Sequence, residues 1–169
     1  MTGDDLAELL PGAFRYAMRL TAGDEAASED LVQEACLRAL HRTAPLREPG
    51  ARKVWLLRIV ANVHCDGVRR RRHPAGSPAA LENESPAGGI DPARRAAVKD
   101  DLAAVLAAAD RLPPRQREVL HLVAVEQLDL SQAAEVLGVS VEAAKASLSL
   151  ARQRLRAEFE GVANLGRSR

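Results

Sequence analysis

The sequence predicts an all-α protein with two small helical domains joined by a flexible linker, the C-terminal one a helix-turn-helix. Three observations predict this class. Only 2% of the 169 residues are aromatic, and alanine, leucine and arginine dominate. Apolar residues recur at helical spacing in several separate segments. Proline and glycine gather at residues 74–90, where this spacing is lost. We therefore expect domains at residues 1–73 and 92–169, with the linker at 74–91.

Three helices are expected in the N-terminal domain. The first covers residues 4–20 and is broken by Gly23-Asp24. The second begins at Asp24 or Ser28 and runs to about residue 42, before Ala44-Pro45. The third follows Pro49-Gly50 and ends in four consecutive arginines.

The C-terminal domain carries clear signals for where helices start and stop. Asp91-Pro92 supplies an N-cap and a first-turn proline for a helix that reaches about residue 110. Leu112-Pro113-Pro114-Arg115 opens the next helix, because proline is tolerated in a first turn.

The helix-turn-helix follows. Asp129 and Gln132 form the polar pair of a capping box, and Gly138 ends that short helix. Ser140 then caps a helix that reaches about residue 159. Its inward face is expected to carry Val141, Ala144, Leu148, Ala151 and Leu155. Such a unit can offer its longer helix to the DNA major groove; a plain helical hairpin in a bundle is the alternative.

Composition excludes several classes of protein. There is no secretory leader and no apolar run near the roughly 20 residues that span a bilayer, so we expect a soluble, cytoplasmic protein. Cys36 and Cys65 are isolated, and His64 beside Cys65 makes a poor chelate, so no metal or other cofactor is expected. There is no glycine-rich phosphate loop and no nucleophile–base set, so we do not expect an enzyme.

Charge is segregated along the chain although the net charge is only +1. Residues 47–73 hold eight Lys or Arg residues and two acids, whereas residues 74–92 hold three acids and no Lys or Arg. Such segregation usually reflects binding partners.

Two sets of motifs resemble one family. Ala-Ser-Glu-Asp-Leu-Val-Gln-Glu at 27–34, Trp-Leu-Leu-Arg-Ile-Val-Ala-Asn at 55–62, and Asp66 with Arg69-Arg70 resemble domain two of extracytoplasmic-function (ECF) sigma factors. Leu-Pro-Pro-Arg-Gln-Arg-Glu-Val-Leu at 112–120, Ala-Glu-Val-Leu-Gly-Val-Ser at 134–140 and Lys145 resemble domain four.

The resemblance implies a dissociable subunit of bacterial RNA polymerase that recognises promoters. Domain two would bind the clamp helices of core RNA polymerase and read the −10 element as a single strand. Domain four would bind the flap of the polymerase and read the −35 element in duplex DNA. An anti-sigma factor is the further partner that the family implies, and no small-molecule substrate is expected.

The resemblance assigns the site residues. The residues assigned to polymerase binding are Glu29, Asp30, Gln33 and Glu34. Alternatively, these four side chains simply form a solvated polar face of the helix. The −10 set is Arg58, Asn62, Asp66, Arg69 and Arg70, a polar stripe in which Asp66 could instead pair with Arg69 or Arg70. Trp55 is expected mainly in the core. The −35 set is Ser140, Glu142, Lys145, Ser147, Ser149 and Arg152, and this helix departs from the family pattern.

Alternatives remain at this point. The acidic linker is either a plain tether or a mimic of RNA near the active centre of the polymerase. The chain itself could be a regulator that binds duplex DNA without polymerase, or a decoy that sequesters an anti-sigma factor without binding DNA.

Overall fold

The computed structural model describes residues 3–41, 49–72 and 100–166, where all regular structure is helical. The N-terminal half comprises α1 (Gly3–Leu20), α2 (Glu25–His41) and α3 (Pro49–Arg72). The C-terminal half comprises α5 (Asp100–Asp110), α6 (Pro114–Ala124), α7 (Leu130–Leu137) and α8 (Val141–Gly166). The all-α class is confirmed. The linker at 74–91 and the helix start at Asp91-Pro92 lie outside the described residues.

Local capping explains where the helices begin. Asp24, rather than Ser28, caps α2: its Oδ1 accepts a hydrogen bond from the Ala27 amide at 3.0 Å. The Asp129 carboxylate accepts from the Gln132 amide at 2.8 Å, and the Gln132 side chain accepts from the Asp129 amide at 3.0 Å. Gly138 takes the left-handed conformation at φ +63°, which ends α7. The capping box and the glycine turn are therefore confirmed.

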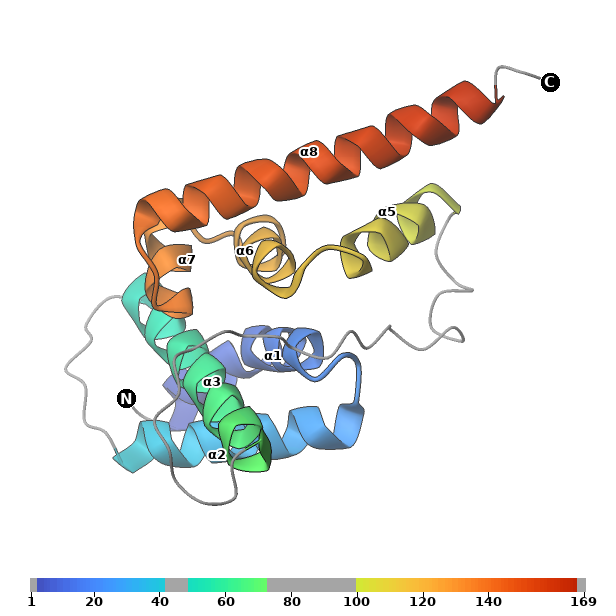
Figure 1. Ribbon diagram of the computed structural model, residues 1–169. Coiled ribbons are helices and arrows are strands. Elements are labelled where there is room, and N and C mark those ends of the chain that lie inside the picture. Colours follow the sequence, from blue (N-terminus) through green and yellow to red (C-terminus); the bar gives the residue numbers. More distant parts are fainter. Residues whose placement is uncertain (1–2, 42–48, 73–99, 167–169) are drawn as a thin grey trace.

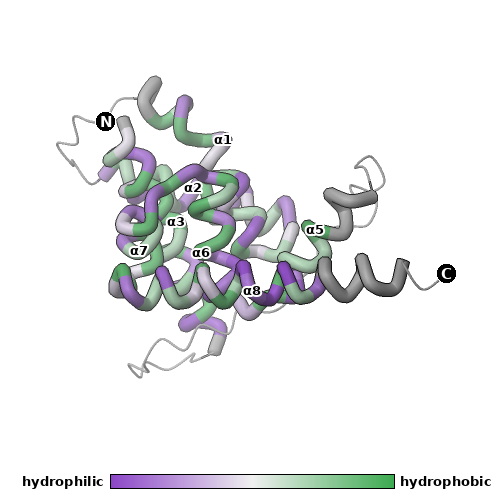
Figure 2. The backbone as a smooth tube through the Cα atoms, turned by 90° about the horizontal axis from the view of Figure 1, so that it is seen from above, coloured by the Kyte–Doolittle hydropathy of each residue, from purple (hydrophilic) through white to green (hydrophobic). Residues whose placement is uncertain are grey.

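The last helix differs from its prediction in two respects. Ser140 caps it as expected, accepting from the Ala143 amide at 3.1 Å, but the helix continues to Gly166. Ala144, Leu148 and Ala151 are buried, whereas Val141 is 41% exposed. The prediction that Val141 faces inward is wrong, because in the first turn of α8 its neighbours leave it uncovered. Figure 2 shows hydrophilic and hydrophobic residues alternating along α8.

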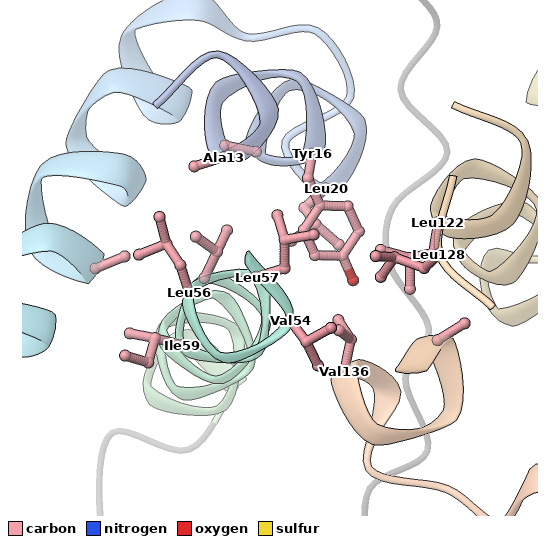
Figure 3. Packing of buried hydrophobic residues seen from close by; sticks show 14 of the residues in the cluster. Ala13, Tyr16, Leu20, Val54, Leu56, Leu57, Ile59, Leu122, Leu128 and Val136 are labelled. Carbon is pink, nitrogen blue, oxygen red and sulfur yellow. The ribbon is translucent and has the colours of Figure 1, made fainter. Parts of the chain in front are cut away.

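The two halves pack against each other in layers. In Figure 1, α8 forms one outer layer, α5, α6 and α7 lie beneath it, and α2 forms the opposite outer layer with α1 and α3 between. The most extensive contacts between the halves are those of α3 with α7 and of α1 with α6. Tyr16 and Val54 of the N-terminal half meet Leu122, Leu128 and Val136 of the C-terminal half in one apolar cluster (Figure 3). The halves therefore share a hydrophobic core.

Candidate polymerase and nucleic-acid interfaces

The acidic face of α2 lies on the outer surface. Glu29, Asp30 and Gln33 are exposed, and they stand beside the buried Leu31 and Val32 that attach this helix to the core. The fourth residue of the predicted polymerase-binding set, Glu34, is engaged within the molecule. The Glu34 carboxylate accepts a hydrogen bond from Arg38 Nε at 2.8 Å and is half-buried. Three of the four side chains are thus available to a partner without breaking an internal bond.

The polar stripe on α3 is partly engaged inside the molecule. Asn62, Arg69 and Arg70 are exposed. Asp66 pairs neither with Arg69 nor with Arg70: its Oδ2 accepts a hydrogen bond from Arg38 Nη1 of α2 at 3.0 Å. Together with Glu34, Asp66 raises the pKa of Arg38 through hydrogen bonds.

Arg58 faces the other half of the molecule. Its Nη1 lies 3.5 Å from Glu135 Oε1 of α7, and both side chains are about half exposed. Trp55, nearby on α3, is half-buried and packs against the shared core, as its helical spacing predicts. Arg58 therefore pairs with α7 where the resemblance expects it to contact DNA.

A cleft of about 520 Å³ lies between α3 and the C-terminal half. Asn62, Asp66 and Arg69 line its α3 side. Arg115, Glu118 and the turn at 136–139 line the opposite side. Glu118 is nearly buried, and that burial raises the pKa of its carboxyl although Arg115 acts in the opposite direction. Part of the predicted −10 surface thus faces a wall made by α6 and the end of α7.

The outer face of α8 carries most of the predicted −35 residues. Ser140, Glu142, Lys145, Ser149 and Arg152 are exposed, and Ser147 is half-buried. An open groove of about 640 Å³ is lined by Leu130, Lys145, Leu148, Ser149, Arg152, Gln153 and Arg156. Arg156 adds a third cation to Lys145 and Arg152 there. Sequence reasoning did not include Arg156 or Gln153, although their spacing of one helical turn from Arg152 and Ser149 indicates the same face.

A buried carboxylate joins the two halves, and sequence reasoning missed it entirely. Glu126 follows α6, and its side chain is fully buried. It accepts hydrogen bonds from Arg15 Nε at 2.9 Å and Nη2 at 3.1 Å, and Lys53 Nζ lies 3.0 Å from its Oε2. Burial alone would raise the pKa of Glu126, but the hydrogen bonds from Arg15 and Lys53 outweigh burial and lower it. Glu126 is therefore held as a carboxylate.

The two cysteines lie on different helices, Cys36 on α2 and Cys65 on α3. Cys36 and Cys65 are both half-buried and form no disulfide, and burial raises the pKa of the Cys36 thiol. Within the described residues, no group of three His, Cys, Asp or Glu side chains is placed to hold a metal ion.

Comparison with known proteins decides the family. The model of Sigma-70 region 2 matches residues 6–73, and that of Sigma-70, region 4 matches residues 102–155. The ECF RNA polymerase sigma factor SigM of Mycobacterium tuberculosis is 34% identical over 149 residues, covering 88% of this chain and 71% of SigM. The chain belongs to the ECF family of RNA polymerase sigma factors. The alternative of a plain helical bundle is thereby removed, and members of this family are transcription factors rather than enzymes.

Two further proteins are similar to this ECF sigma factor, one in sequence and one in fold. The Xanthomonas campestris protein named "Probable RNA polymerase sigma factor RfaY" is 37% identical over 143 residues, which cover 80% of this chain. The match spans only 35% of RfaY. The solved structure of the sigma factor RpoE from Bartonella quintana, in complex with the anti-sigma factor NepR, shares the fold with a TM-score of 0.63. It is 21% identical, and the match covers 93% of this chain and 95% of RpoE.

Within residues 3–41, 49–72 and 100–166, every helix is too short or too polar to cross a bilayer.

Proposed function

We propose that this ECF sigma factor binds bacterial core RNA polymerase, recognises −10 and −35 promoter elements and directs transcription initiation in the cytoplasm. The observation that carries the proposal is the arrangement of two opposite outer faces. The acidic face of α2 stands on one side of the molecule, and the polar face of α8, presented by a capped helix-turn-helix, stands on the other. One protein can therefore hold a polymerase and reach duplex DNA at the same time.

The proposed roles follow the chemistry of each surface. Glu29, Asp30 and Gln33, with Glu34, bind the clamp helices, since carboxylates and an amide suit a basic partner helix. Asn62, Arg69 and Arg70, together with Arg58 and Asp66, bind the −10 strand through base edges and phosphates. The −35 duplex lies on α8, where Ser140, Glu142, Lys145, Ser147, Ser149 and Arg152 face it. The C-terminal half also contacts the polymerase flap.

The proposed domains are residues 1–73 and 92–169, tethered by the acidic linker at 74–91. An anti-sigma factor is a further proposed partner. The structurally similar RpoE was solved with the anti-sigma factor NepR, and that complex supports the proposal through fold alone.

The test combines co-elution with transcription. Purified protein is passed with core RNA polymerase over a size-exclusion column, and start sites are then mapped on a promoter library. We expect co-elution and a discrete set of start sites. The Asp30→Ala and Gln33→Ala variants should reduce both, whereas Glu25→Ala, an exposed acid in the first turn of the same helix, should not.

The alternatives predict other outcomes. A decoy would bind neither polymerase nor promoter, and a duplex-binding regulator would bind DNA specifically without polymerase. Either result would contradict the proposed function.

A further inference from the structure

Glu126 occupies a site built for it between α1 and α3. Arg15 of α1 binds both of its carboxylate oxygens, and Lys53 of α3 binds Oε2 and also donates to the Glu126 carbonyl oxygen at 2.6 Å. A Cβ atom added at Gly12 of α1 would lie 3.0 Å from Glu126 Oε2. Glycine weakens a helix interior, so its presence here matches the close approach of this carboxylate.

Two further ion pairs join the halves with the same arrangement of charge. Arg19 Nη1 of α1 lies 2.6 Å from Asp110 Oδ1 of α5, and Arg58 of α3 pairs with Glu135 of α7. In all of these contacts the N-terminal half provides the cation and the C-terminal half provides the acid. Carboxylates of the C-terminal half therefore neutralise cations of the half that the proposed function brings to an anionic strand.

The packing of the halves places part of the proposed −10 surface in a cleft and leaves the other two surfaces open. Asn62, Asp66 and Arg69 line the 520 Å³ cleft, whose other wall is the α6–α7 region, and Arg58 is paired with Glu135. The acidic face of α2 and the outer face of α8 stay exposed in the same arrangement. Polymerase can thus be bound while Arg58 is still paired and part of the −10 surface still faces the cleft.

We propose that the packed arrangement is a self-inhibited form of the protein and that Glu126 is the latch that holds it. Withdrawal of Glu126 from Arg15 and Lys53 separates α7 from α3, opens the cleft and releases Arg58. The inhibitory role rests on the proposed function, whereas the latch itself is a property of the chain alone.

The native thiols give a direct readout of opening. Cys65 lines the cleft, whereas Cys36 lies in a different groove between α1 and α2. Alkylation of each thiol by iodoacetamide is followed by peptide mass spectrometry in wild type, in Glu126→Gln and in Glu8→Gln, whose exposed acid lies on the surface of α1. We expect Glu126→Gln to accelerate labelling of Cys65 about tenfold and to leave Cys36 unchanged. Glu8→Gln should change neither rate.

A second variant guards against misfolding. If Glu126→Gln accelerates both thiols, the variant is unfolded, and Arg15→Gln decides, because the Arg15 side chain is half exposed and its replacement removes the bidentate partner of Glu126. Faster labelling of Cys65 alone in Arg15→Gln supports the latch. An unchanged Cys65 rate in the folded variant overturns it.

A transcription assay distinguishes failure of this inference from failure of the proposed function. With limiting protein and core polymerase, Glu126→Gln should give several-fold more initial transcript than wild type. If wild type is active and the opened variant gains nothing, self-inhibition is wrong. If Cys65 responds as expected but neither protein directs transcription, the latch stands and the proposed function fails.

Discussion

The ring of His121 on α6 stacks on the ring of Tyr16 on α1, with centroids 5.8 Å apart and planes inclined by 26°. This pair lies at the junction of the two halves, close to Glu126, whose Oε1 is 3.7 Å from His121 Nε2. Burial lowers the pKa of His121 from 6.5 to about 4, and the nearby carboxylate offsets this only in part. The junction therefore holds a neutral imidazole at neutral pH.

The first prediction concerns pH. Unfolded His121 takes up a proton below pH 6.5, whereas the folded protein resists it until about pH 4, so stability falls as pH decreases through this range. Between pH 7 and pH 5 the linked loss is about 2 kcal/mol in the free energy of unfolding. His121→Phe, which keeps a neutral ring, should remove this loss. Urea unfolding at both pH values measures it.

A second group, Glu118, also makes the stability of the protein depend on pH, and comparing wild type with His121→Phe cancels its contribution. Burial raises the pKa of Glu118, which acts in the opposite direction because its folded form retains a proton that the unfolded form releases. Both proteins contain Glu118, so only their difference reports His121. Equal acid sensitivity of wild type and His121→Phe would contradict the assignment.

Tyr16 provides the second prediction. Its side chain is fully buried, and its hydroxyl has no hydrogen-bond partner among the described residues. Leaving a buried polar group unsatisfied costs about 1–3 kcal/mol. Tyr16→Phe should therefore unfold at the same or a higher urea concentration than wild type at pH 7. A loss of more than about 1 kcal/mol would mean that the hydroxyl is bonded.

Two glycines form a matched pair for the third prediction. Gly138 has φ +63° with open space around it, so Gly138→Ala should destabilise the protein by about 1–2 kcal/mol through backbone strain alone. Gly67 lies inside α3, where the nearest atom to an added Cβ is Arg71 Nη2 at 3.9 Å. Gly67→Ala should instead stabilise by about 0.5–1 kcal/mol. Thermal unfolding of both variants checks the opposite signs.

The groove on α8 yields the fourth prediction. If Lys145, Arg152 and Arg156 contact phosphates, each alanine variant should weaken binding of the holoenzyme to −35 duplex DNA. Each should also reduce the slope of log affinity against log salt by about 0.9. Arg154→Ala is the control, because Arg154 donates to Gln116 at 3.1 Å on another face of α8. Fluorescence anisotropy across a salt series measures affinity and slope, and an equal effect of Arg154→Ala would remove the groove from the interface.

Local signals in the sequence predicted much of this fold. The capping box of Asp129 and Gln132, the left-handed turn at Gly138 and the Ser140 cap depend on residues within four positions of each other, so their chemistry is readable along the chain. The buried stripe of Ala144, Leu148 and Ala151 follows from helical periodicity. Val141 obeys the same spacing but lies in the first turn of its helix, and periodicity does not indicate where covering neighbours end.

The relation between the halves was not predictable in this way. Glu126 is separated by 111 positions from Arg15 and by 73 from Lys53, and an isolated acid after an apolar helix reads as solvent-exposed. Asp66 likewise bonds Arg38 of another helix rather than its own neighbours. Such partners depend on tertiary packing. Gly12 in the middle of α1 was one local sign of a close approach.

The most direct test of the account is single-round run-off transcription from one mapped promoter, with its −10 and −35 elements scrambled one at a time. Recognition through both α3 and α8 predicts that core polymerase with this protein initiates at the intact promoter and loses most of that activity when either element is scrambled. Initiation that is indifferent to one of the elements, or equal with and without the protein, would contradict it.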